Sequence, residues 1–178
     1  VHGYSNTGGF GIDGGVCSLM GASLASPDKI FFGIFGDLAF FYDMNVLGNR
    51  HVGHNVRIML INNGKGTEFR NYNHPGAQFG EDSDEYIAAA RHYGNKSHQL
   101  VKHYAEDLGY EYLTASSKEE YLNVVERFTT EEMTDRPMVL EVFTNNEDES
   151  DALKIINTLQ TSPDAVAKQL VKNVLGQK

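Results

Sequence analysis

Short runs of hydrophobic residues alternate along the chain with longer stretches in which hydrophobic residues recur at helical spacing. The short runs are typical of strands buried on both faces of a sheet, and they predict strands at 30–35, 56–61, 110–114 and 138–143. The longer stretches predict helices at 14–25, 38–49, 84–93, 97–108, 117–130, 148–160 and 164–175. Buried strands that alternate with helices predict an α/β fold, a doubly wound parallel sheet with helices on both faces, in a single domain.

Local signals mark several ends of these elements. Ser117 and Glu120 have the spacing of a capping box, in which each side chain binds a backbone N–H group that the helix leaves unpaired. Ser162 and Pro163 are typical of the start of a helix. Residues 70–82 are rich in Asn, Gly, Pro and acidic residues, which predicts a long mobile loop.

Composition excludes several classes of protein. The chain has 178 residues, 40% of them hydrophobic, which is enough for one domain with its own core. A net charge of −9 argues against nucleic-acid binding, and no apolar run approaches the roughly 20 residues of a membrane span. The lone cysteine, Cys17, fits a protein of the reducing cytoplasm. Because the first residue is Val1, we expect a processed or excised piece of a longer chain.

Glycine and charge divide the chain near residue 80. Of the 18 glycines, 15 fall in residues 1–80, and that segment has no net charge, so the whole negative charge lies in the remainder. Glycine lets the backbone approach a ligand closely and adopt positive φ. The first half is therefore predicted to face the ligand.

Polar residues follow two neighbouring predicted strands. Gly36-Asp37 comes directly after the first strand, and Asn62-Asn63-Gly64-Lys65-Gly66 comes directly after the second. Ligands of open parallel sheets bind beyond the carboxyl ends of the strands, where these two segments would meet. Carboxylate, amide and carbonyl oxygens suit Mg²⁺ or Ca²⁺, and the helix from Leu38 would offer backbone N–H groups to phosphates. Each segment alone could be an ordinary turn, whereas the pair predicts a metal-bridged diphosphate.

The same residues resemble a known family. Gly36-Asp37, followed 25 and 26 residues later by Asn62-Asn63, resembles the thiamine-diphosphate (ThDP) motif of the pyruvate decarboxylase and acetohydroxyacid synthase superfamily. The strings GDLAFFYDMN and VRIMLINNGKG, with YSNTGGFGIDGG upstream, look most like MenD-type synthases. Thr7 stands where that group typically has an arginine, so the resemblance does not fix the substrate.

The resemblance implies a role for each matching position. Asp37, the Asn63 side chain and the Lys65 carbonyl would hold Mg²⁺. The amides of Leu38 and Ala39 would meet the diphosphate, the Phe10 carbonyl would accept from the aminopyrimidine, and Ile12 would be the wedge under the bent cofactor. Gly11, Gly36, Gly66 and Phe69 would be further cofactor contacts. Two candidate accessory residues do not come from the match: Glu68, which replaces an apolar residue expected near the thiazolium, and His74, which could close over a bound substrate as a proton donor. Either of them could instead be an ordinary solvated side chain.

The resemblance also implies the activity and the partners. It implies a ThDP- and Mg²⁺-dependent lyase or transferase that decarboxylates a 2-keto acid, or ligates its acyl group to an acceptor. The activating glutamate of this family lies on a separate pyrimidine-binding domain, so we expect no catalytic residue of that kind in this chain. Residues 1–178 would then be the C-terminal diphosphate domain alone, inactive by itself, from a protein that forms a homodimer or homotetramer.

Two alternatives come from the same residues. A regulatory homologue could keep the diphosphate site and lack the chemistry. Residues 9–14 also match the dinucleotide pattern G-x-G-x-x-G of nicotinamide- and flavin-binding Rossmann domains. That pattern requires a hydrophobic strand directly before it, and VHGYSN is too polar to be one. We therefore expect the ThDP site.

Overall fold

In the part of the chain that the structure describes, four parallel strands form the central sheet. The computed structural model of the chain describes residues 2–82, 84 and 97–159. All strand pairs are parallel, and their order in the sheet is β1-β2-β4-β3. The strands are β1 (Phe31–Gly36), β2 (Val56–Asn62), β3 (Glu111–Ala115) and β4 (Met138–Phe143).

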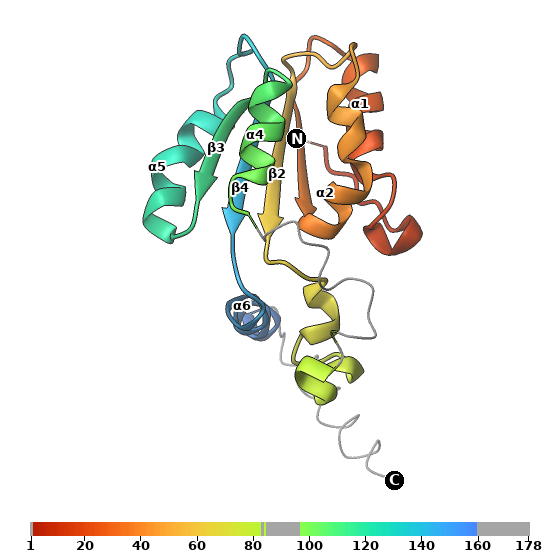
Figure 1. Cartoon of the computed structure of the whole chain (residues 1–178), viewed down its shortest axis with the longest axis vertical. Helices are drawn as coiled ribbons and strands as arrows, with labels where there is room; N and C mark the ends of the chain where they lie inside the picture. The colour runs from red at the N-terminus through yellow and green to blue at the C-terminus, as the bar shows by residue number, and fades with distance from the viewer. Residues whose placement is uncertain (1, 83, 85–96, 160–178) are drawn as a thin grey trace.

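Helices cover both faces of this sheet. On one face, side chains from α1 (Gly15–Ala25), α2 (Asp37–Asp43) and α4 (Leu100–Asp107) pack in the main core with alternate residues of β2. On the other face, α5 (Lys118–Thr129) packs Phe128 against Met138 and Leu140. Figure 1 shows α6 (Asn146–Leu159) beyond the carboxyl ends of the strands. The predicted α/β fold with a parallel sheet is confirmed.

Most predicted elements are present, with shifted ends. The helix expected at 38–49 ends earlier as α2 and continues as the 3-10 helix η2 (Met44–Gly48). The predicted capping box of α5 forms in a modified way: Ser117 Oγ accepts from the Glu120 N–H, but Glu120 Oε2 accepts from Ser116 rather than from Ser117. The helix expected at 84–93, apart from residue 84, and the helix expected at 164–175, with Ser162 and Pro163, lie outside the described residues.

The segment predicted to be a long loop has regular structure. It contains the last residue of the 3-10 helix η3 (Thr67–Arg70) and the whole of the 3-10 helix η4 (Pro75–Asp82). Between them, the N–H of His74 donates to the carbonyl of Asn71 at 2.8 Å. Short-range backbone bonds therefore give this polar segment an ordered path without the apolar periodicity of an α-helix.

The prediction that the first strand is buried on both faces is wrong. Ile34 is 70% exposed and Phe32 is 47% exposed, both on the face of β1 that α5 only partly covers. The reason is the position of β1 at the edge of the sheet, while α5 packs mainly over β3 and β4. Phe32 reaches α5 only through an edge contact with the ring of Phe128.

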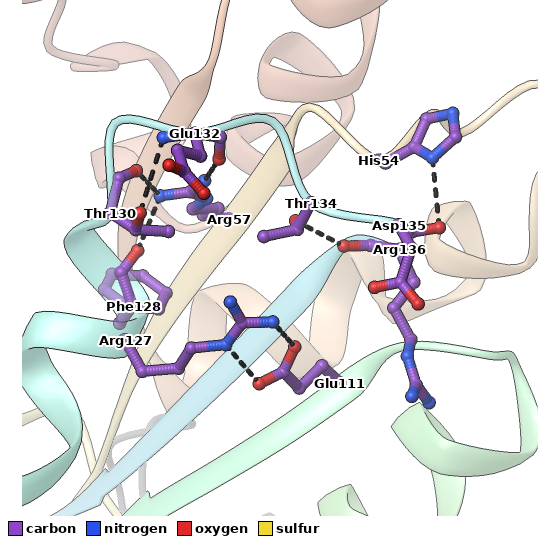
Figure 2. A network of polar contacts seen from close by, with 10 residues as sticks. All are labelled: His54, Arg57, Glu111, Arg127, Phe128, Thr130, Glu132, Thr134, Asp135 and Arg136. Atoms are coloured by element: carbon purple, nitrogen blue, oxygen red, sulfur yellow. Dashed lines mark hydrogen bonds and ion pairs between the residues drawn. The ribbon is translucent and has the colours of Figure 1, made fainter.

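A buried arginine joins β2 to the end of α5 (Figure 2). The Arg57 side chain is fully buried and donates to the carbonyls of Phe128, Thr130 and Glu132. The first of these bonds measures 2.9 Å and the last 2.7 Å. The last carbonyls of a helix have no partner within the helix, so the guanidinium satisfies groups at and just beyond the end of α5.

A polar cavity of about 630 Å³ lies beside β3, at the amino end of the sheet. Its lining includes Arg127 and Glu111, which already pair with each other through two hydrogen bonds of 2.7 and 2.8 Å (Figure 2). Ligands of parallel sheets bind at the opposite, carboxyl edge. We therefore assign the functional site to the carboxyl edge and not to this cavity.

The described helices give no sign of a membrane span, since none of them is both long enough and apolar enough to cross a bilayer.

Candidate metal and diphosphate site

The segments that follow β1 and β2 lie next to each other. The two strands pair in parallel, with Gly36 opposite Ile61, so that Asp37 and Asn63 leave the same edge of the sheet. The N–H of Gly64 donates to Oδ2 of Asp37 at 2.5 Å. The predicted adjacency of the two segments is therefore confirmed, while the role of each residue as a ligand remains a prediction.

Asp37 begins α2 and is only 1% exposed. Its Oδ1 accepts from the N–H of Leu38 at 2.7 Å, and its Oδ2 accepts from Gly64. A buried carboxylate needs such donors, because burial removes it from water. The Leu38 N–H is thus engaged by Asp37 in this structure, and the expected contacts of Leu38 and Ala39 with a diphosphate remain predictions.

The side-chain amide of Asn63 is held at both of its ends. Its Oδ1 accepts from the N–H of Lys65 at 3.1 Å, and its Nδ2 lies 3.0 and 3.1 Å from the two carboxylate oxygens of Glu149. Gly64, between Asn63 and Lys65, has a φ of 80°, which an L side chain rarely adopts. A glycine at this position therefore allows the tight turn that brings Asn63 and Lys65 together.

The chemistry of these oxygens fits Mg²⁺. Among the residues that the structure describes, no group of three or more His, Cys, Asp or Glu side chains could hold a metal ion. The predicted set instead combines one carboxylate, one amide oxygen and one backbone carbonyl. Mg²⁺ commonly takes few protein ligands and completes its octahedron with phosphate oxygens and water. The set therefore suits a metal that arrives with a diphosphate.

A charged network fixes the turn that follows Asn63. Asp84 accepts from Lys65 Nζ at 3.1 Å and from Arg70 at 2.7 Å. Burial raises the pKa of Asp84, but the hydrogen bonds from Lys65 and Arg70 outweigh burial and hold the pKa below its usual value. Asp84 therefore stays ionised and links the Lys65 turn to η3.

The predicted wedge segment lies in the 3-10 helix η1 (Gly8–Gly11), with Ile12 directly after it. Gly11 has a φ of 74°, and a Cβ there would lie 3.1 Å from the Asn6 carbonyl, so this position favours glycine. Asp43 fixes the start of the following helix α1, because its Oδ2 accepts from the N–H of Val16 at 3.0 Å. Figure 1 shows this segment toward the end of the molecule where the strands terminate. The cofactor contacts of Phe10, Gly11, Ile12 and Gly36 remain predictions.

The predicted cofactor contacts Gly66 and Phe69 and the candidate accessory residue Glu68 lie in or directly before η3, and the second accessory candidate, His74, follows η3. Glu68 is exposed, while the rings of Phe69 and His74 pack edge to face with their centroids 5.3 Å apart. Nδ1 of His74 accepts from the N–H of Gly76 at 2.9 Å. His74 therefore has a structural role in the turn before η4, and its predicted accessory role, like that of Glu68, remains a prediction.

Sequence reasoning missed a buried carboxyl group beside the site. Glu141 on β4 is 1% exposed; its Oε1 accepts from Asn62 Nδ2 at 2.7 Å and its Oε2 accepts from the Tyr112 hydroxyl at 2.6 Å. The signal was present in the sequence, because a glutamate in the middle of the apolar run MVLEVF must be buried. A buried polar group of this kind requires hydrogen-bond partners.

Burial raises the pKa of Glu141 above its usual value, although the donors Tyr112 and Asn62 act in the opposite direction. A carboxyl group with a raised folded-state pKa stabilises the fold most below its unfolded pKa, and this contribution falls as pH rises toward the folded value. We therefore expect Glu141→Gln, which mimics the protonated acid, to gain stability relative to the parent as the pH is raised from about 4 upward. Urea unfolding across this range measures the difference. A constant difference at all pH values would contradict the expectation.

Comparisons with known proteins identify the family. The chain belongs to the family described as thiamine pyrophosphate enzyme, C-terminal TPP binding domain, whose model matches residues 2–142. The cofactor of this family is thiamine diphosphate, and the resemblance seen in the sequence is thereby confirmed.

Three similar curated proteins share one name. The chain is 39% identical over 149 residues to the 2-succinyl-5-enolpyruvyl-6-hydroxy-3-cyclohexene-1-carboxylate synthase of Phocaeicola vulgatus, covering 84% of this chain and 25% of that protein. It is 36% identical to the synthase of the same name from Bacteroides thetaiotaomicron, with the same coverage. The corresponding protein of Christiangramia forsetii is 36% identical over 79% of this chain and 22% of its own length. The chain thus spans about a quarter of the length of these relatives.

Proposed function

We propose that this chain binds the diphosphate of ThDP through Mg²⁺ and forms one half of the active site of a 2-keto-acid decarboxylase or carboligase. The proposal rests on one observation: the segments that follow β1 and β2 are joined by a hydrogen bond from the N–H of Gly64 to the buried carboxylate of Asp37. Next to this bond, the N–H of Lys65 holds the side-chain amide of Asn63 in one orientation. The relatives are named synthases, which favours a ligation over a simple decarboxylation.

Each part of the site has a defined task in this proposal. Asp37, Asn63 Oδ1 and the Lys65 carbonyl hold the metal, and the amides of Leu38 and Ala39 face the diphosphate. Phe10, Gly11 and Ile12 support the bent cofactor. Bound ThDP would supply the nucleophilic carbon and the electron sink that loss of CO₂ from a 2-keto acid requires. Gly66 and Phe69 would contact the cofactor, and Glu68 and His74 would be accessory residues near the substrate.

The remaining parts of the active site would come from elsewhere. We infer that a pyrimidine-binding domain of the same or another subunit supplies the activating glutamate, and that the whole protein is a cytoplasmic homodimer or homotetramer. The alignment with only a quarter of each relative's length supports a role for further domains. A regulatory homologue would bind ThDP in the same way but would not release CO₂ from 2-keto acids.

The test uses the natural polypeptide that contains this chain. We expect calorimetry to detect ThDP binding with Mg²⁺ present and an affinity at least about 100-fold weaker after EDTA treatment, because bound Mg²⁺ would offset the repulsion between the Asp37 carboxylate and the diphosphate. Asn63→Ala should weaken the Mg²⁺-dependent binding, whereas Asn123→Ala, an exposed site on α5, should not. Equal binding with and without metal, or an unchanged Asn63→Ala variant, would refute the proposal.

A further inference from the structure

The orientation of the Asn63 amide decides which atom faces the proposed metal. A side-chain amide has an oxygen, which can coordinate Mg²⁺, and an NH₂ group, which cannot. A rotation of about 180° at the end of the side chain exchanges these two atoms with almost no change of shape. A residue that prevents this rotation would therefore control metal affinity without touching the metal.

The partners of Asn63 permit only one orientation. The carboxylate of Glu149 can only accept, so Nδ2 must face it, at 3.0 and 3.1 Å. The backbone N–H of Lys65 can only donate, so Oδ1 must face the turn, at 3.1 Å. A flipped amide would place its oxygen against the carboxylate and its NH₂ against the N–H group, so that repulsive contacts would replace the three hydrogen bonds.

Glu149 is itself fixed in position. The Thr144 hydroxyl, just after β4, donates to its Oε1 at 2.5 Å. The next residue on α6, Ser150, accepts from the N–H of Tyr72 at 3.0 Å, which ties the helix to the segment after η3. The carboxylate therefore has a defined place beyond the carboxyl end of the sheet, where α6 lies in Figure 1.

We propose that Glu149 is a positioning residue that keeps the oxygen of Asn63 turned toward the metal of the diphosphate site. The inference rests on the proposed function of Asn63. It adds a residue of α6 that lies 86 positions away in the sequence and that would act only through the Asn63 amide. Outer partners of metal ligands typically change metal affinity by about 10- to 100-fold.

The first experiment compares two isosteric substitutions in the natural polypeptide. Glu149→Gln can present either its oxygen or its NH₂ to Asn63, so the amide is free to flip, and we expect Mn²⁺ affinity at saturating ThDP to fall about 10-fold or more. Free Mn²⁺ is measured by electron paramagnetic resonance, without any assay of activity. Glu147→Gln removes the same charge from the exposed side of the same helical turn and should change affinity by less than about 2-fold.

A second background separates positioning from simple charge attraction. In Asn63→Asp, both terminal atoms of the side chain are oxygens, so a rotation of the group by about 180° changes nothing at the metal. We expect Glu149→Gln in that background to lower Mn²⁺ affinity much less than it does beside Asn63, because only the effect of the lost carboxylate charge remains. A role through charge alone would instead give the same loss in both backgrounds, which the double-mutant cycle detects.

Other outcomes are equally decisive. If Glu149→Gln does not fold, Thr144→Val decides, because it keeps the charge but removes the donor that fixes Glu149, and it should also lower Mn²⁺ affinity. The inference would be overturned if the folded Glu149→Gln variant kept the parent's Mn²⁺ affinity, or if Thr144→Val kept it where that variant decides. Equal losses of affinity in the parent and Asn63→Asp backgrounds would also overturn it. If Asn63→Ala itself leaves metal binding intact, the proposed function fails; if only Glu149→Gln is silent, the inference alone fails.

Discussion

Replacing Asp37 with alanine is expected to remove Mg²⁺-dependent ThDP binding from the natural polypeptide, with a loss of affinity of about 100-fold or more. Among the proposed ligands, Asp37 alone has a charged ligand atom, and it is buried and aligned by the N–H groups of Leu38 and Gly64. Substitution of a residue that only supports a metal ligand typically lowers metal affinity by about 10- to 100-fold. Substitution of a charged residue that binds the metal directly should therefore lower affinity by at least the upper value. Calorimetric titration of ThDP at fixed Mg²⁺ gives the affinity.

Two further variants make this result specific. Asp37→Asn keeps the size of the side chain and one acceptor oxygen, so its loss should be smaller than that of Asp37→Ala. Asp28→Ala removes an exposed aspartate between α1 and β1 and should bind ThDP like the parent. Parent-like, Mg²⁺-dependent binding by Asp37→Ala would show that the diphosphate is held elsewhere.

Replacing Arg57 with methionine is expected to lower the free energy of unfolding by about 3 kcal/mol or more. Methionine fills much of the same volume but donates no hydrogen bonds. The carbonyls of Phe128, Thr130 and Glu132 would then lose the donor that holds the end of α5 to the sheet (Figure 2). Buried acceptors that lose their partners cost far more than exposed ones, because water does not replace the bond.

Urea unfolding followed by circular dichroism measures the effect of Arg57→Met. Arg127→Met is the matched control, since Arg127 also bonds an acceptor near β3 but its side chain is 48% exposed. Exposed ion pairs add little to stability, so this control should unfold close to the parent. A similar loss of unfolding free energy in both variants would mean that the buried hydrogen bonds of Arg57 stabilise the fold no more than an exposed ion pair does.

Much of the site could be read from local sequence. The short apolar runs predicted four strands within one residue of their observed ends. The reason is clearest for β2, whose continuous hydrophobic run follows from its burial in the middle of the parallel sheet. The predicted meeting of Asp37 and Asn63 required only that two consecutive strands pair in parallel, which they do with Gly36 opposite Ile61. The strand positions and this meeting of two strand ends both depend on residues or elements that are close in the sequence.

The partners of these residues could not be read in the same way. The spatial order β1-β2-β4-β3 places the last strand, rather than the third, beside β2, and so brings Glu141 to Asn62. Glu149 reaches Asn63 because α6 passes beyond the end of the sheet. The exposed face of β1 likewise follows from its edge position, although its sequence is as apolar as that of a buried strand.

The sequence by itself determined the class of fold, the family and the two strand ends that carry the candidate ligands. Tertiary structure alone decided which glutamate holds each asparagine and which face of the first strand stays uncovered. The physical reason is that hydrophobic periodicity and turn chemistry act over a few residues, whereas a hydrogen bond between residues 79 or 86 positions apart depends on strand order and helix placement. Those are set by the packing of the whole core.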